Sequence, residues 1–520
     1  MLNKLNQHPG VYLVGSGPGD PGLLTIKAQA LLESCDILVH DFLVSNQIMG
    51  YVNPAADEIY VGKKGFTRHI TQDEINELLV QLATKNPEAV IVRLKGGDPY
   101  VFGRGGEEGL ALHEAGISFE VVPGVTSGIA ALAYAGIPAT HRGLAASMAF
   151  ITGHEDPTKP NSQINWEYLA KGVDTLIFYM GVKNLPNIVE NLTKYGRPLD
   201  EPVALVRWGT NPEQESLVSD LEHVVKEVGA RDFKAPAIIC VGKVVDLKEA
   251  LSFFENKPLH GKTIAITRAR AQASNMHAQL LEAGAKVIEF PTIKIEPYLD
   301  HDELIDFCEH VGEYSWLVFT SVNGVDTFFD GLLEIGKDSR ALSSIKVASI
   351  GSATAEHLLD RGIVPDLIPD EYKAEGVLEA LLERGVGAGD KVVIARAKKT
   401  RQVLNEGLEA KGVEVKVMEV YETRVDGGDI QEAFAEALKA GEIDAISFSS
   451  SSTVDNFIKL IKDSFESEEE MKSYLEKLCI ASIGPITSKT LNTYGIAPTI
   501  EAEEFTINCL VQDIISYFKK

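Results

Sequence analysis

Short apolar segments alternate with stretches of helical periodicity along the chain, and this alternation limits the fold more than any other feature. One predicted helix, Asp73–Ala83, follows a capping box formed by Thr71 and Glu74. Strands alternating with helices predict α/β layers. In the first half the predicted strands are Gly10–Val14, Ile37–Val39, Ala89–Leu94, Val121–Val122, Thr175–Tyr179, Val203–Val206 and Ala237–Val241.

The chain has 520 residues, which is too long for one hydrophobic core. Because domains commonly contain about 100–200 residues, we expect several of them. The stretch Ser252–Gly261 contains Asn, Pro and Gly, interrupts the alternation, and is followed at once by a predicted strand, Thr263–Thr267. We therefore expect a first region of residues 1–252, a linker of residues 253–260, and a second region of residues 261–520.

The second region contains an internal duplication. Residues 319–321 (Phe-Thr-Ser) recur as residues 448–450 (Phe-Ser-Ser), each followed by Val, Asp and Phe at matching spacing. Residues 348–351 recur as residues 481–484, both with the sequence Ala-Ser-Ile-Gly. These matches predict two similar α/β units, with a ligand site in the cleft between them.

Composition excludes several classes of function. A net charge of −26 argues against nucleic acid or an anionic membrane as a partner, whereas a polyanionic small molecule needs only local basic residues. The five cysteines are scattered without metal-ligand spacing, so we expect neither a disulfide framework nor a metal. No apolar run approaches the about 18 residues of a membrane span, and the first ten residues lack the apolar core of a signal peptide. These features predict a cytoplasmic protein.

Glycine-rich loops follow several predicted strands of the first region, at residues 15–22, 95–99, 123–127, 180–181 and 207–209. In open α/β sheets ligands bind beyond the carboxyl ends of strands, where glycine permits close approach of the backbone. The first loop, GSGPGD, departs from the G-x-G-x-x-G pattern, and the chain has no G-x-x-x-x-G-K-[ST] loop. A nicotinamide or ATP site is therefore not favoured.

These loops carry GSGPGDPGLLTIKA (15–28), VGKK (61–64), RLKGGDPYVFGRGGEE (93–108), VPGVTSG (122–128), GIPATHRG (136–143) and FYMG (178–181). Together they resemble the tetrapyrrole methylases, and most closely uroporphyrinogen-III C-methyltransferase, over about residues 8–250. The resemblance implies a two-lobed α/β fold, usually dimeric, with S-adenosylmethionine in a cleft between the lobes. The donor-binding positions that it implies are Pro18, Gly96, Gly97, Asp98, Val101, Thr126, Ser127, Met180 and Gly209.

The same resemblance implies that Asp41 accepts a proton and that Lys63 donates one. A pyrrole carbon attacks the sulfonium methyl in line, and the alkylated ring must then lose a proton, which suits a carboxylate. Without the resemblance, Asp41 would be a carboxylate that caps loop amides and Lys63 a solvated cation. The substrate carries eight carboxylates, and its candidate ligands are Arg93, Lys95, Arg104 and Arg142.

The second region contains TRARAQ (267–272), VFTSVNGV (318–325), IGSATAEHL (350–358), VYET (420–423) and IASIGPITSKTL (480–491). These segments resemble uroporphyrinogen-III synthase over about residues 261–520. The resemblance implies two α/β domains joined by a two-stranded ladder, with domain one at residues 261–296 plus 424–520 and domain two at residues 297–423.

Four hydroxyl side chains of the second region are candidates for its chemistry. Tyr421 matches the family's tyrosine and could help the hydroxymethyl oxygen of hydroxymethylbilane to leave, although a packing role at a hinge is equally open. Ser321, Ser450 and Thr487 are candidate substrate contacts. Because Ser and Thr before a helix commonly cap it, capping and ligand binding both remain open for these residues.

The expected function is a bifunctional enzyme of porphyrin, siroheme or cobalamin biosynthesis. It would cyclise hydroxymethylbilane to uroporphyrinogen III and methylate that product twice to precorrin-2. Its partners would be small tetrapyrroles and a second copy of the chain, bound through the first region. One alternative is a methylase of the same fold that acts on a protein or ribosomal RNA. Another is a non-catalytic ligand-binding module at residues 261–520.

Overall fold

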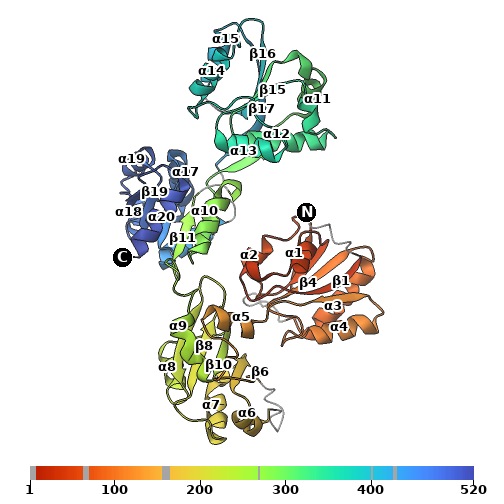
Figure 1. The fold of residues 1–520 in the computed structure, drawn as a ribbon, viewed down its shortest axis with the longest axis vertical. Helices are drawn as coiled ribbons and strands as arrows, with labels where there is room; N and C mark the ends of the chain where they lie inside the picture. The colour runs from red at the N-terminus through yellow and green to blue at the C-terminus, as the bar shows by residue number, and fades with distance from the viewer. Residues whose placement is uncertain are drawn as a thin grey trace. The chain divides into compact units, whose positions relative to one another are not determined.

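The computed structural model describes residues 8–62, 70–154, 164–267, 270–399, 402–425 and 430–519. By its internal contacts the chain divides into two compact units (Figure 1). One comprises residues 1–263, 278–286 and 515–520, and the other comprises residues 264–277 and 287–514. Each contains sheets covered by helices, which is the expected α/β class. No helix in the described ranges is long and apolar enough to cross a membrane.

The first sheet of the first unit has five parallel strands in the order β3-β2-β4-β1-β5. Successive side chains of β1 point to opposite faces, so Val14 packs with α1 whereas Leu13 packs with α3 and α4. The elements are β1 (Gly10–Gly15), α1 (Ile26–Leu32), β2 (Ile37–His40), α2 (Asn46–Met49), β3 (Asp57–Tyr60), α3 (Gln72–Lys85), β4 (Val90–Lys95), α4 (Gly105–Glu114) and β5 (Phe119–Val122).

The second sheet of this unit is mixed, in the order β6-β7-β10-β8-β9, and β10 runs antiparallel to both of its neighbours. Phe178 on β7 packs against α6 and α7, whereas its neighbour Tyr179 faces α5. The elements are α5 (Ser127–Tyr134), β6 (Met148–Thr152), α6 (Trp166–Gly172), β7 (Thr175–Tyr179), α7 (Leu185–Lys194), β8 (Pro202–Arg207), β9 (Glu215–Asp220), α8 (Val224–Ala230), β10 (Ala237–Val241) and α9 (Lys248–Leu251).

All seven strands expected in the first region are present, and so is the expected capping box. The Thr71 hydroxyl accepts from the Glu74 amide at 3.3 Å, and the Glu74 carboxylate accepts from the Thr71 amide at 2.7 Å. The sequence pattern missed β3, β6 and β9. All three are edge strands, which bury fewer side chains than inner strands and therefore lack a continuous apolar run.

Residues 253–260, expected to be a linker, are part of the first unit. Phe254 and Leu259 are buried, and the Phe254 ring lies 5.0 Å from the Tyr134 ring. Glu255 accepts hydrogen bonds from Gln214 at 2.8 Å and Lys248 at 2.6 Å. Asn, Pro and Gly correctly indicated an interruption of regular structure, but the apolar side chains among them anchor the segment.

The second unit carries two five-stranded sheets, ordered β12-β11-β18-β19-β20 and β13-β17-β16-β14-β15. An antiparallel ladder pairs β13 with the end of β17, from Lys294 opposite Arg424 to Pro297 opposite Tyr421. The strands are β11 (Thr263–Ile266), β12 (Lys286–Glu289), β13 (Lys294–Pro297), β14 (Trp316–Phe319), β15 (Lys346–Ser349), β16 (Lys391–Ala397), β17 (Glu414–Arg424), β18 (Ala445–Phe448), β19 (Cys479–Ser482) and β20 (Ile500–Glu501).

The helices of this part of the chain are α10 (Arg270–Glu282), α11 (His301–Glu309), α12 (Val322–Glu334), α13 (Ser352–Asp360), α14 (Ala374–Glu383), α15 (Val403–Glu409), α16 (Gln431–Ala440), α17 (Ser451–Ile461), α18 (Glu468–Leu475), α19 (Pro485–Thr493) and α20 (Ile507–Phe518). The duplication is visible among them. The order β14-α12-β15-α13 recurs as β18-α17-β19-α19 with the additional helix α18. The Ile350 amide donates to the Phe319 carbonyl at 3.0 Å, and Ile483 repeats this contact with Phe448 at 3.0 Å.

Candidate active site

Three loops of the first unit meet in backbone contact beyond the carboxyl ends of β1, β4 and β5. Gly97 donates to the Gly17 carbonyl at 2.7 Å and accepts from the Gly17 amide at 3.1 Å. Gly97 has φ +69°, and a Cβ on Gly124 would lie 2.3 Å from the Gly97 carbonyl oxygen. The Asp98 carboxylate accepts from the Gly124 amide at 3.1 Å. The convergence of these loops therefore requires glycine.

The first loop also contacts the loop after β8. The Asp20 amide donates to the Thr210 hydroxyl at 3.1 Å, and the Asn211 side chain donates to the Pro18 carbonyl at 3.2 Å. Tyr134, on α5, donates to the Asp20 carboxylate at 2.5 Å. These contacts bring Pro18 and Gly209 to the same site from positions far apart in the sequence.

Two adjoining cavities of about 480 and 700 Å³ lie at these loops. Their walls share Leu43, Gly96, Gly97, Ser127, Tyr179 and Met180. The structure thus brings together all nine residues expected to bind the methyl donor. Pro18, Gly96, Gly97, Ser127, Met180 and Gly209 line the smaller cavity, and Asp98, Val101 and Thr126 line the larger one.

The cavity walls include non-glycine residues in the left-handed region. Phe102, Arg104, Met180 and Trp208 have φ of +54°, +60°, +56° and +47°. This conformation is unfavourable for residues with a Cβ, and it persists where the surrounding structure enforces it, as at ligand sites.

The larger cavity carries the predicted proton acceptor. Asp41 follows β2 directly, and its side chain is 26% exposed. One of its oxygens accepts from Arg93 Nη2 at 3.1 Å, and the other accepts from the Leu43 amide at 3.1 Å. The carboxylate therefore has a defined orientation at the cavity wall. Lys63, its expected proton donor, lies outside the described residues.

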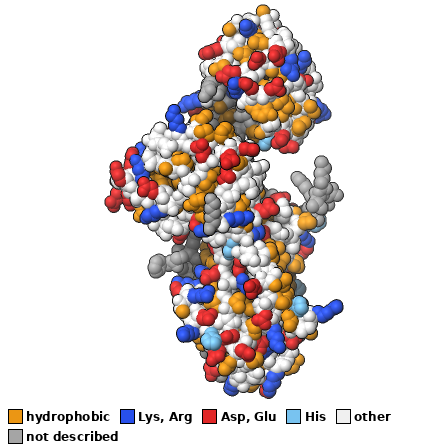
Figure 2. All heavy atoms as spheres, turned by 60° about the vertical axis from the view of Figure 1, so that its left-hand side comes forward, with side chains coloured by type: hydrophobic (Ala, Val, Ile, Leu, Met, Phe, Trp, Pro, Cys, Tyr) orange, Lys and Arg blue, Asp and Glu red, His pale blue; other side chains and the backbone are white. Residues whose placement is uncertain are grey.

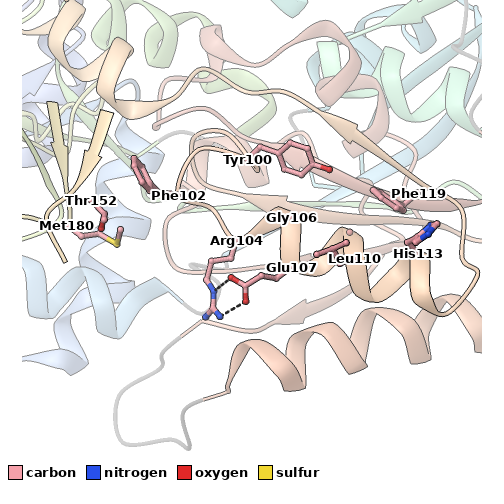
Figure 3. A pocket seen from close by; sticks show the side chains of 12 residues that line it. Tyr100, Phe102, Arg104, Gly106, Glu107, Leu110, His113, Phe119, Thr152 and Met180 are labelled. Atoms are coloured by element: carbon pink, nitrogen blue, oxygen red, sulfur yellow. Dashed lines mark hydrogen bonds and ion pairs between the residues drawn. The ribbon is translucent and has the colours of Figure 1, made fainter. Parts of the chain in front are cut away.

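The four candidate substrate cations differ in their surroundings. Arg93 and Lys95 line the larger cavity but are buried, and both pair with the buried Glu108. Burial is the main cause that lowers the pKa of Lys95, and the positive charge of Arg93 lowers it further. Arg104 is exposed and pairs with Glu107 at 2.6 Å (Figure 3). Arg142 is exposed and lies outside both cavity linings.

In the second unit two of the four candidate residues, Tyr421 and Ser321, are in contact. Tyr421 is a buried residue, and its hydroxyl lies 3.0 Å from Ser321 Oγ. Ser321 also caps α12 by accepting from the Gly324 amide at 3.0 Å. Ser450 caps α17 in the corresponding position of the repeat, and Thr487 is buried in the first turn of α19.

Comparison with known proteins matches two families to this chain. The family of tetrapyrrole (corrin/porphyrin) methylases matches residues 10–225, and uroporphyrinogen-III synthase HemD matches residues 274–512. The porphyrin biosynthesis protein HemD of Ruminiclostridium josui is 36% identical over 98% of both chains. The chain belongs to the family that joins these two enzymes. We refer to the part of the chain that contains residues 10–225 as the methylase half and to the part that contains residues 274–512 as the synthase half.

Two further relatives carry the names of methyltransferases. A uroporphyrinogen-III C-methyltransferase of Bacillus subtilis (strain 168) is 40% identical over 70% of this chain and 74% of its own length. The S-adenosyl-L-methionine-dependent uroporphyrinogen III methyltransferase of Methanosarcina barkeri is 51% identical over 46% of this chain and 94% of its own length.

Sequence reasoning left several site residues of the methylase half unassigned. Tyr179 shares a hydrogen bond of 2.7 Å with Thr126 and accepts from the Gly128 amide at 2.8 Å, so it fixes the loop that carries Ser127. Glu108 joins Arg93 and Lys95 from behind the cavity. Both residues belong to motifs quoted above, but a motif does not indicate which side chains are buried.

Proposed function

We propose that the methylase half transfers two methyl groups from S-adenosylmethionine to uroporphyrinogen III and thereby forms precorrin-2. The observation that carries this proposal is the assembly of all nine expected donor-binding residues around two adjoining cavities, one of which contains Asp41. The printed names of the Bacillus subtilis and Methanosarcina barkeri relatives support the same substrate, and the latter name supports the same donor.

The two cavities suggest a division of roles. The smaller one, with Gly97 and Gly209 in its lining, suits the donor, which when bound supplies an electrophilic methyl group. The larger one, next to Asp41, suits the tetrapyrrole. The shared wall would orient the pyrrole carbon in line with the methyl group, and Asp41 would accept the ring proton afterwards. Lys63 would act as a proton donor, and Arg104 and Arg142 would bind substrate carboxylates.

We propose that the synthase half, residues 261–520, cyclises hydroxymethylbilane to uroporphyrinogen III. Tyr421 would donate a hydrogen bond to the departing hydroxymethyl oxygen. Ser321, which contacts the Tyr421 hydroxyl, can accept or donate in this pair. Ser450 and Thr487 would contact substrate from the other sheet. Domain one would comprise residues 261–296 plus 424–520, and domain two residues 297–423.

A homodimer formed through the methylase half is also part of this proposal. A groove of about 870 Å³ runs along α4 beside the Arg104–Glu107 pair (Figure 3). Tyr100 and Leu110 are more than half exposed in it. Contiguous exposed apolar surface commonly marks an interface. On the face shown in Figure 2, acidic, basic and hydrophobic side chains are interspersed. Light scattering should give twice the mass of the chain, and a monomeric mass would contradict the dimer.

One experiment tests both reactions. The whole protein receives hydroxymethylbilane and S-adenosylmethionine, and the products are identified by mass and by isomer. The expected product is the type III isomer carrying two added methyl groups. Formation of isomer I would contradict the synthase role, and a product that stops at one methyl group would contradict the second methylation. Supplying uroporphyrinogen III directly separates failure of the methylase half from failure of the synthase half.

A further inference from the structure

A buried charge cluster, defined here as Arg93, Lys95 and Glu108, lies at the cavity wall that carries Asp41. Arg93 and Lys95 line the cavity, and Glu108 lies behind them. Glu108 is fully buried in the first turn of α4. Its Oε1 accepts from Arg93 Nε at 3.1 Å and from Lys95 Nζ at 2.7 Å. Among the described residues, its Oε2 has no hydrogen-bond partner. With all three groups ionised, the cluster has one positive charge in excess.

Asp41 is the carboxylate that balances this excess. The parallel register of β2 and β4 sets Val39 beside Arg93, so Asp41 follows β2 within reach of the guanidinium. Arg93 donates a hydrogen bond from Nε to Glu108, from Nη1 to the Leu94 carbonyl at 2.9 Å, and from Nη2 to Asp41 at 3.1 Å. Its planar fork therefore spans two carboxylates, one behind the wall and one at the cavity.

Stability alone does not account for this arrangement. Burying charges carries a desolvation penalty, and apolar packing of the same volume is often as stable or more stable. An unpartnered buried oxygen adds a further cost. The cluster therefore fits a role in shaping the site, because Arg93 and Lys95 line the cavity and the Arg93 guanidinium holds Asp41 there.

We propose that Arg93 is a positioning residue for Asp41 and that Glu108, fixed also by Lys95, anchors Arg93 from behind. This inference rests on the proposed role of Asp41 as proton acceptor. Arg93 and the Leu43 amide each donate a hydrogen bond to a different oxygen of Asp41, and together they fix the carboxylate plane relative to the cavity. Arg93 thus acts through Asp41, and each of its three nitrogens donates a hydrogen bond within the protein.

A double-mutant cycle on the full-length protein tests the proposal, with kcat and KM measured for methylation of uroporphyrinogen III. Asp41→Asn should lower kcat by about 10²–10⁴-fold. Arg93→Gln should lower kcat by about 10²-fold, the loss typical of a misplaced group, with KM unchanged. In the Asp41→Asn background, Arg93→Gln should change kcat by less than about threefold, since residues that act as a unit are not additive.

Two variants control for folding. Arg93→Lys keeps the buried charge but cannot span both carboxylates, so its kcat should also be lower than that of the wild type. A wild-type kcat in this variant would overturn the proposal. Arg197→Gln removes another arginine, whose side chain is 8% exposed, pairs with Glu201 at 2.6 Å and lies outside both cavity linings. It should lower the melting temperature and leave kcat unchanged.

The possible outcomes separate the two hypotheses. If the two losses of kcat multiply in the Asp41→Asn, Arg93→Gln double variant, the positioning role is overturned. A rise in KM of Arg93→Gln at unchanged kcat would also overturn it, because that result would identify Arg93 as a substrate ligand. If Arg93→Gln does not fold, the same cycle is run with Arg93→Lys and the same criteria apply. Wild-type kcat in Asp41→Asn alone would instead refute the proposed proton acceptor, and the positioning role with it.

Discussion

Substitution of Gly97 by leucine tests whether the glycine loops hold the methyl donor. Gly97 has φ +69°, a conformation that costs a residue with a Cβ about 1–2 kcal/mol. A Cβ at this position would lie 3.8 Å from Ser127 N, so the backbone itself leaves room for it. The rest of the leucine side chain must then occupy space at the wall that both cavities share. Overpacking costs about 1–3 kcal/mol, which corresponds to about a 5- to 150-fold weaker affinity for S-adenosylmethionine.

Gly116 offers a matched control for this substitution. It has φ +70°, and no atom lies within 4 Å of a Cβ built there. Gly116→Leu should therefore cost similar stability and leave donor binding unchanged. Calorimetry with S-adenosylmethionine measures the affinity of both variants, thermal unfolding measures their stability, and synthase turnover in the same preparation reports on the other half. Equal affinity in the two variants would refute the assignment of the donor site to this wall.

Three further predictions concern single residues. Asp41→Asn should retain S-adenosylmethionine affinity in calorimetry while methylation slows, whereas loss of donor binding would point to a structural role. Tyr421→Phe and Ser321→Ala should each slow formation of uroporphyrinogen III, by up to about 10²-fold, without changing the melting temperature of the synthase half; unchanged turnover would leave Tyr421 a packing residue. Burial opposes ionisation of Glu255, but hydrogen bonds from Lys248, Ser216 and Gln214 prevail and lower its pKa. Its contribution to stability is therefore present above its ordinary pKa of 4.5 and lost as the pH falls through the lowered value. Glu255→Gln should cost about 1.5–3 kcal/mol at pH 7 and progressively less in acid, measured by urea unfolding at several pH values; a constant difference would contradict this assignment.

Much of the fold could be predicted because its signals are local. Inner strands such as β7 and β10 are almost entirely apolar, and the capping box at Thr71 lies within four residues. The duplication was recognisable because both copies keep the same hydroxyl at a helix start, Ser321 and Ser450. The edge strands β3, β6 and β9 were missed because partial exposure removes the pattern on which such a prediction rests.

The sequence by itself determined which loops would form the site of the methylase half, because glycine motifs after strands must converge where parallel strands end. Only the tertiary structure decided what each charged side chain does there. Arg93 and Glu108 occur in one motif, yet their pairing depends on how α4 packs against the sheet, and the contact of Arg93 with Asp41 depends on β2 lying next to β4. Tyr421 and Ser321 likewise meet across 100 residues of chain. Strand order, helix packing and burial are properties of the whole fold, and they determine whether a cation faces substrate or is neutralised inside the protein.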